Sequence, residues 1–140
     1  NTDLERMVDL AVNIANNAEY YLRFPPLADI SDLVQMSDAA RFMVREAIDA
    51  FVNADEVLAG NVLKADDKVD AFKDKVFRDV MELIKKDPSI AEQGLNIILI
   101  ARNLERIGDH ATNVAEDVIF SVSGEDVRHS DAHKKTEQPK

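Results

Sequence analysis

Two segments of this chain repeat one pattern a hundred residues apart. Residues 4–17 and 104–117 are identical at seven of fourteen aligned positions, and the shared residues are Leu, Glu, Arg, Asp, Asn and two Ala. Packing against a core would require only the apolar positions to recur, so the recurring polar residues indicate two copies of one functional helix. The fold must therefore contain this helix twice.

The composition of the chain favours an all-α fold. Only 4 Gly and 4 Pro occur in 140 residues, which is typical of long uninterrupted helices. The formal net charge of −10 and the lack of a basic stripe argue against nucleic-acid binding. No run approaches the ~18 apolar residues of a membrane span, so no membrane insertion is expected. Because cysteine is absent, any metal ligands must be oxygen or imidazole groups.

Apolar residues recur at helical spacing over four segments. We predict helices at about 3–23, 30–53, 55–86 and 89–123. The first ends at Pro25-Pro26, and Asp87-Pro88 separates the third from the fourth. The inward face of the second helix is predicted to comprise Ile30, Leu33, Val34, Ser37, Ala40, Val44, Ile48 and Phe51.

Short connections make consecutive helices antiparallel. Residues 27–124 are therefore predicted to form an antiparallel up-down three-helix bundle. Residues 1–24 are then an extra N-terminal helix, equivalent to the last helix of a preceding repeat. Its apolar stripe needs a cover, so we expect a homo-oligomer if the 140-residue chain stands alone. The polar segment 125–140 is expected to be a flexible tail.

Two pairs of carboxylates are spaced to share helix faces. Asp66 and Asp70 lie four residues apart on the third predicted helix, as do Glu105 and Asp109 on the fourth. Both pairs are about 17–21 residues from the turn at Asp87, so they lie level across an antiparallel interface. Like charges gathered in this way favour a bound cation, and the four residues are candidate metal ligands.

A plainer interpretation remains open. The same carboxylates can form an ordinary solvated face in which Glu105 pairs with Arg102, Asp109 with Arg106, and Asp70 with Lys73. Asp67 should point about 100° away from Asp66. Asp74 and Asn113 are secondary candidates. His110, next to Asp109, either supports a metal ligand through a hydrogen bond or is a solvated or core-edge histidine.

No catalytic residue is assigned. The sequence contains no Gly-rich phosphate loop, no arrangement of Ser, His and Asp typical of hydrolases, and no cysteine nucleophile. We therefore expect no enzyme.

The sequence of residues 104–116, Leu-Glu-Arg-Ile-Gly-Asp-His-Ala-Thr-Asn-Val-Ala-Glu, strongly resembles the signature helix of the PhoU family. Residues 66–70 look like the partner motif of that family, and 124–129 resemble its ending. The resemblance implies two tandem three-helix bundles with metal sites, to which Asp66, Asp70, Glu105 and Asp109 would contribute here. Glu5 and Asp9 match the motif of the first bundle, a second metal site that is incomplete in this chain. The implied metal is iron, with zinc, manganese or magnesium as alternatives.

The resemblance also implies a function. PhoU proteins are cytoplasmic negative regulators that link the phosphate transporter ATPase subunit to a phosphate sensor histidine kinase. Two other functions stay open: a purely structural helical interaction domain, and a metal-dependent hydrolase that activates water at the carboxylate cluster. Metal content and phosphatase activity would separate these three functions.

Overall fold

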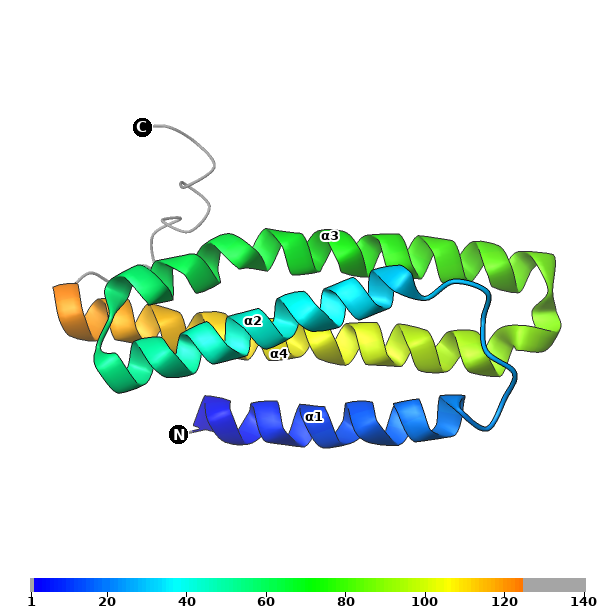
Figure 1. The fold of residues 1–140 in the computed structure, drawn as a ribbon, viewed down its shortest axis with the longest axis horizontal. Coiled ribbons are helices and arrows are strands. Elements are labelled where there is room, and N and C mark those ends of the chain that lie inside the picture. Colours follow the sequence, from blue (N-terminus) through cyan, green and yellow to red (C-terminus); the bar gives the residue numbers. More distant parts are fainter. Residues whose placement is uncertain (1, 125–140) are drawn as a thin grey trace.

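In the computed structural model, which describes residues 2–124, the chain forms four α-helices and one short 3-10 turn (Figure 1). The elements are α1 (Thr2–Tyr21), α2 (Ser31–Asn53), α3 (Glu56–Lys86), η1 (Pro88–Ile90) and α4 (Ala91–Ser123). The prediction of an all-α fold with four helices is confirmed, with boundaries that differ by at most two residues. The tail predicted at 125–140 lies outside the described residues.

Local signals explain where α3 and α4 begin. The carboxylate of Asp55 accepts hydrogen bonds from the amides of Val57 (2.9 Å) and Leu58 (3.2 Å), which caps α3. Asp87 accepts from the backbone amide of Ser89 (3.1 Å) and from its hydroxyl (2.6 Å), and so starts η1 after α3 ends. These side-chain bonds satisfy backbone donors that the helices leave unpaired.

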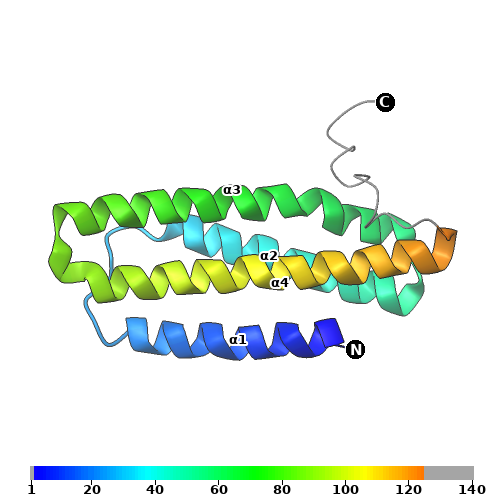
Figure 2. The ribbon, with the colours of Figure 1, turned by 180° about the vertical axis from the view of Figure 1, so that it is seen from behind.

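Helix α4 is the centre of the molecule. It packs against α1, α2 and α3, whereas α1 packs only against α4 among the helices of residues 2–124. Figures 1 and 2 show α2, α3 and α4 as an up-down bundle, with α1 lying along the outer side of α4. Helices α1 and α4 are antiparallel, since Asp3 contacts His110 and Tyr20 contacts Glu92. The two copies of the repeat therefore run side by side in opposite directions.

The buried face of α2 differs from the prediction by about one residue. Val34, Ile48 and Phe51 were expected inside but are 52%, 39% and 54% exposed. Leu33 and Ala40 are buried as predicted, and Met36, Met43, Ala47 and Ala50 complete the buried face with a regular heptad spacing. Small alanines and flexible methionines fit the narrow space against α3 and α4, and the bulkier residues remain at the surface.

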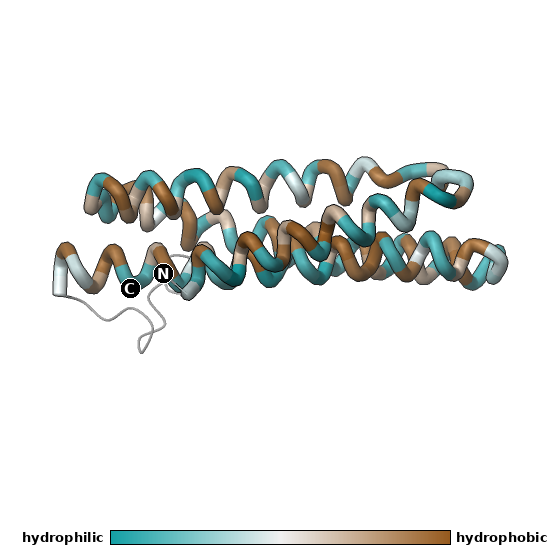
Figure 3. Tube along the Cα trace, turned by 90° about the horizontal axis from the view of Figure 1, so that it is seen from below, coloured by the Kyte–Doolittle hydropathy of each residue, from teal (hydrophilic) through white to brown (hydrophobic). Residues whose placement is uncertain are grey.

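Helix α4 is buried on two sides, because it packs against α2 and α3 of the bundle and also against α1. The apolar spacing along residues 89–123 predicts a seam of Ile97, Ala101, Leu104, Gly108, Ala111, Ala115, Val118 and Val122. The first seven of these residues are buried. Val122 was also predicted there but is 44% exposed. A second row, Ile100, Ile107 and Val114, is buried on the side of α1. Figure 3 shows hydrophobic and hydrophilic positions alternating along all four helices.

The connection between α1 and α2 is held to the bundle by specific bonds. The amide of Leu27 donates to the hydroxyl of Tyr21 (2.8 Å), and both residues are buried. The side-chain amide of Gln93 donates to the carbonyl of Pro25 (3.4 Å). Among the described residues, no helix combines the length and apolar character that crossing a membrane requires.

Candidate metal centre

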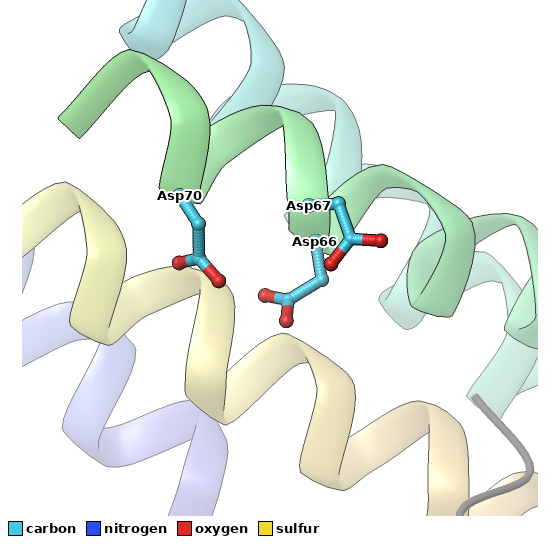
Figure 4. Close-up of side chains that lie close together, drawn as sticks. All are labelled: Asp66, Asp67 and Asp70. Carbon is cyan, nitrogen blue, oxygen red and sulfur yellow. The ribbon is translucent and has the colours of Figure 1, made fainter. Parts of the chain in front are cut away.

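Asp66 and Asp70 project from the middle of α3 toward α4 (Figure 4). Their spacing of one helical turn places both on the same face of α3, where each is half-buried. Glu105 and Asp109 lie opposite, on α4, as the equal distances from the α3–α4 turn predicted. Asp66, Glu105 and Asp109 all act on the carboxyl group of Asp70, so the four predicted carboxylates lie near one edge of the bundle. Among residues 2–124, however, the one group of three mutually close candidate ligands is on α3 alone and excludes Glu105 and Asp109.

Asp70 is at the middle of this cluster. Partial burial, followed by the charge of Asp66 and a hydrogen bond to Glu105, raises the pKa of Asp70 to about 7. The Asp109 charge acts in the same direction. The raised pKa of Asp70 therefore reflects first the loss of water around its carboxyl group and second the negative charges nearby.

Asp109 lies at the solvent edge of the cluster. Loss of water around its carboxylate and the charge of Glu105 raise the pKa of Asp109, while His110, Lys73 and Arg106 oppose the shift. The pKa is therefore raised for two carboxyl groups on different helices, Asp70 on α3 and Asp109 on α4. This marks the edge between α3 and α4 as a candidate functional site.

Lys73 is the residue of the cluster whose position the sequence did not predict. Its Nζ lies 2.8 Å from Oε2 of Glu105, and about a quarter of each side chain is exposed. This ion pair crosses from α3 to α4, whereas the plainer interpretation assigned Lys73 to Asp70 and Arg102 to Glu105. Lys73 also lies 3.7 Å from the exposed carboxylate of Asp74. In the sequence, the one indication that Lys73 belongs to this cluster was its position three residues after Asp70.

The remaining candidates fall into two groups. Asp67 offers an oxygen that lies within 4.8 Å of oxygens of both Asp66 and Asp70, although Figure 4 shows it projecting sideways from α3. It is therefore nearer to the cluster than its helical angle predicted. Asn113 donates to Asp3 (3.3 Å) and so joins α4 to α1. His110 also contacts Asp3, with Nδ1 2.8 Å from Oδ1.

Glu5 and Asp9 are both exposed on α1. Within residues 2–124, the one group of three acidic or histidine side chains with mutually close ligand atoms is Asp66, Asp67 and Asp70. In this part of the chain, Glu5 and Asp9 therefore do not belong to a group of three mutually close candidate ligands.

The donor set between α3 and α4 fits a hard cation. Every candidate ligand is a carboxylate, each comes from a regular helix, and Asp70 is short of compensating positive charge. The two helices hold the donors without any loop. Such a cluster in a helical bundle can bind metal ions.

These observations define a class: an antiparallel helical bundle in which a repeated helix carries one half of a carboxylate cluster. The family model described as the PhoU domain matches residues 33–118. The chain belongs to the PhoU family.

Curated relatives have the same family name. A phosphate-specific transport system accessory protein PhoU homolog 1 from Thermotoga maritima is 39% identical over 130 residues, which cover 90% of this chain and 55% of that protein. The homolog from Pseudomonas aeruginosa is 40% identical over 134 residues, covering 91% and 53%. The homolog from Xylella fastidiosa (strain Temecula1) is 35% identical over 123 residues, covering 88% and 51%.

A solved structure is similar throughout most of the chain. The crystal structure of PhoU from Pseudomonas aeruginosa matches with a TM-score of 0.85 and 36% identity, covering 89% of this chain and 60% of that one. This chain spans about half the length of the curated relatives that it matches. The resemblance read from residues 104–116 is thereby confirmed at the level of family and fold.

Proposed function

We propose that this chain is part of a negative regulator of phosphate transport, and that the cluster between α3 and α4 binds a metal ion. Membership of the PhoU family supports the role in phosphate transport, because relatives are described as accessory proteins of a phosphate-specific transport system. The gathering of Asp66, Glu105 and Asp109 around Asp70, whose pKa rises to about 7 through burial and their charges, supports the metal-binding part. Asp66, Asp70, Glu105 and Asp109 are the proposed ligands, with iron as the first candidate metal.

The proposed regulator acts as an adaptor, not as an enzyme. It would connect the ATPase subunit of a phosphate transporter with a phosphate sensor histidine kinase, at the cytoplasmic side of the membrane. The net charge of −10 supports docking onto basic surfaces of such partners through complementary charge.

Residues 1–24 are proposed to be the last helix of a preceding three-helix repeat. The sequence repeat between α1 and α4, and the doubled length of the relatives, support this division. Helices α1 and α4 are equivalent and antiparallel, so an approximate two-fold axis would relate them. The same axis would place the α2 counterpart of the preceding repeat over α1. A groove of about 560 Å³ lies there, lined by apolar residues that include Met7, Val44 and Ile107.

Metal analysis tests the proposed site. Protein purified without a histidine tag should contain stoichiometric metal, measured by elemental analysis, and Asp70→Asn and Asp109→Asn should lose it while keeping their helical circular dichroism. Asp49→Asn, an equivalent change at an exposed position of α2, should keep the metal. Equal metal content in all four proteins would contradict the assignment.

A separate experiment tests the regulatory role. In cells that lack their own copy, the full-length protein that contains this chain should repress a phosphate-starvation reporter at high phosphate. Co-purification with the transporter ATPase subunit and the kinase should accompany repression. Failure to repress, with the protein present and folded, would favour a purely structural domain, and phosphatase activity of the pure protein would favour the hydrolase.

A further inference from the structure

The cluster between α3 and α4 already contains one cation, the ammonium group of Lys73. It lies 2.8 Å from Oε2 of Glu105, and both side chains are about three-quarters buried. The hydrogen bond to Glu105 is the main cause of a raised pKa for Lys73. Lys73 is therefore charged and paired with one of the proposed metal ligands.

The ammonium of Lys73 is paired with an oxygen of one proposed ligand, Oε2 of Glu105. Besides Glu105, the charge of Lys73 interacts with Asp70, and it lowers the pKa of Asp109. A metal ion bound through Oε2 of Glu105 would compete with the ammonium for the same oxygen, and two cations in direct contact repel each other.

A second acceptor for Lys73 is available outside the cluster. The Oδ1 atom of Asp74 lies 3.7 Å from the same Nζ, and the Asp74 side chain is 74% exposed. The flexible four-carbon stem of lysine can move the charge over this distance without a change in the helix. The stem is positioned near the ring of Phe77, whose centroid is 6.0 Å from Nζ.

We propose that Lys73 is a competing cation that controls metal loading: its ammonium neutralises Glu105 in the metal-free protein and moves to Asp74 when a metal ion binds. This inference rests on the metal site of the proposed function. The metal affinity of the cluster then depends on the free energy needed to break the Lys73–Glu105 pair. The four carboxylates alone would not set the affinity in this way.

Calorimetric titration of the 140-residue protein with Zn²⁺ tests the proposal. Lys73→Met keeps the apolar stem but removes the charge, and should bind Zn²⁺ about tenfold more tightly than the parent. Lys73→Arg should bind more weakly than the parent, because a guanidinium holds a carboxylate through two hydrogen bonds. Lys75→Met makes the same charge change at a residue that pairs with Asp32 (3.1 Å) instead, and should stay within about twofold of the parent.

A second measurement follows Lys73 itself. In nitrogen-detected NMR spectra of the lysine ammonium groups, the Lys73 signal should show slow proton exchange with water, and Zn²⁺ should abolish this protection. Circular dichroism checks that each variant folds, and Lys73→Gln replaces Lys73→Met if that variant does not.

The outcomes distinguish the two proposals. Affinity in Lys73→Met that equals or falls below that of the parent, with Asp70→Asn still abolishing binding, would overturn the role of Lys73 and leave the metal site intact. A Lys73 signal unchanged by bound Zn²⁺ would overturn it as well. Absence of binding in the parent and in Lys73→Met alike would overturn the metal site and with it the role of Lys73.

Discussion

The Nδ1 atom of His110 lies 2.8 Å from Oδ1 of Asp3, and so joins residues that are 107 positions apart in the sequence. The same oxygen accepts a hydrogen bond from Asn113 (3.3 Å). Asp3 is in the first turn of α1, and its two partners are adjacent on the surface of α4. This contact fixes how far α1 is shifted along α4, which apolar packing alone specifies weakly.

Asp3→Ala should loosen α1 without unfolding the bundle. Loss of two hydrogen bonds at a partly exposed site should cost roughly 1 kcal/mol. Hydrogen exchange measured by mass spectrometry should then become faster in residues 2–21 and stay unchanged in α3. Glu19→Ala is the control, since Glu19 only pairs with Arg23 at 3.7 Å on the exposed surface. Equal exchange rates in Asp3→Ala and the parent would show that the contact does not hold α1.

The pKa of Asp70 predicts a pH dependence for metal-free protein. Because this pKa is about 7 in the folded protein and the ordinary value of an aspartate is 3.8, the native state binds the proton more tightly than the unfolded state. The contribution of Asp70 to the free energy of unfolding therefore falls as the pH rises from 3.8 to about 7.

Asp70→Asn should remove this contribution. In the presence of a chelator, the variant should be more stable than the parent at about pH 8, by on the order of 1 kcal/mol once solvent screening is taken into account. The difference should shrink as the pH falls below both pKa values, toward about pH 3, where Asp70 is mostly protonated in both states. Urea titrations at several pH values measure it, and a difference that does not vary with pH would contradict the raised pKa.

Two glycines of α4 should respond differently to alanine. At Gly108 an added Cβ would lie 3.5 Å from Sδ of Met43, an ordinary contact, so Gly108→Ala should stabilise by about 0.5–1 kcal/mol through helix propensity. At Gly94 it would lie 2.8 Å from Cδ1 of Ile84 and 3.0 Å from Cγ1 of Val80, so Gly94→Ala should destabilise by roughly 1 kcal/mol.

Thermal unfolding of both variants tests this difference. Gly108→Leu serves as the third member of the series, because the space that accepts a methyl group beside Met43 does not accept a larger side chain, and the melting temperature should fall strongly. A stable Gly108→Leu protein would mean that α2 can move away from α4.

The groove between α1 and α2 predicts self-association of the 140-residue polypeptide when it is studied alone. Its lining includes Val8, which is 63% exposed, and Ile48, which is 39% exposed. Apolar surface of this kind is covered in stable proteins, so sedimentation velocity should show an association that increases with concentration.

Charges in the groove should prevent this association. Val8→Asp combined with Ile48→Asp should give a monomer with unchanged helix content. Val57→Asp changes a residue that is 71% exposed outside the groove, and should associate like the parent. A parent chain that is monomeric over the whole concentration range would contradict the prediction.

Local and regular signals in the sequence determined the helices and the convergence of the carboxylates. Pro25-Pro26, the cap residue Asp55 and Asp87-Pro88 act on their own neighbours, so the helix boundaries follow from nearby residues. The approach of Asp66 and Asp70 to Glu105 and Asp109 follows from equal distances along two antiparallel helices with a constant rise. The PhoU family was evident from residues 104–116 for the same reason, since a motif on one helix is contiguous in sequence.

Only the tertiary structure decided which partner each side chain meets. The inward face of α2 differed by one residue because the spacing of α3 and α4 favours Ala47 and Ala50 over the larger Ile48 and Phe51. Lys73 pairs with Glu105 and not with Asp70, since its long side chain reaches across the α3–α4 interface. Such choices depend on distances between helices, and no spacing within a single helix contains that information.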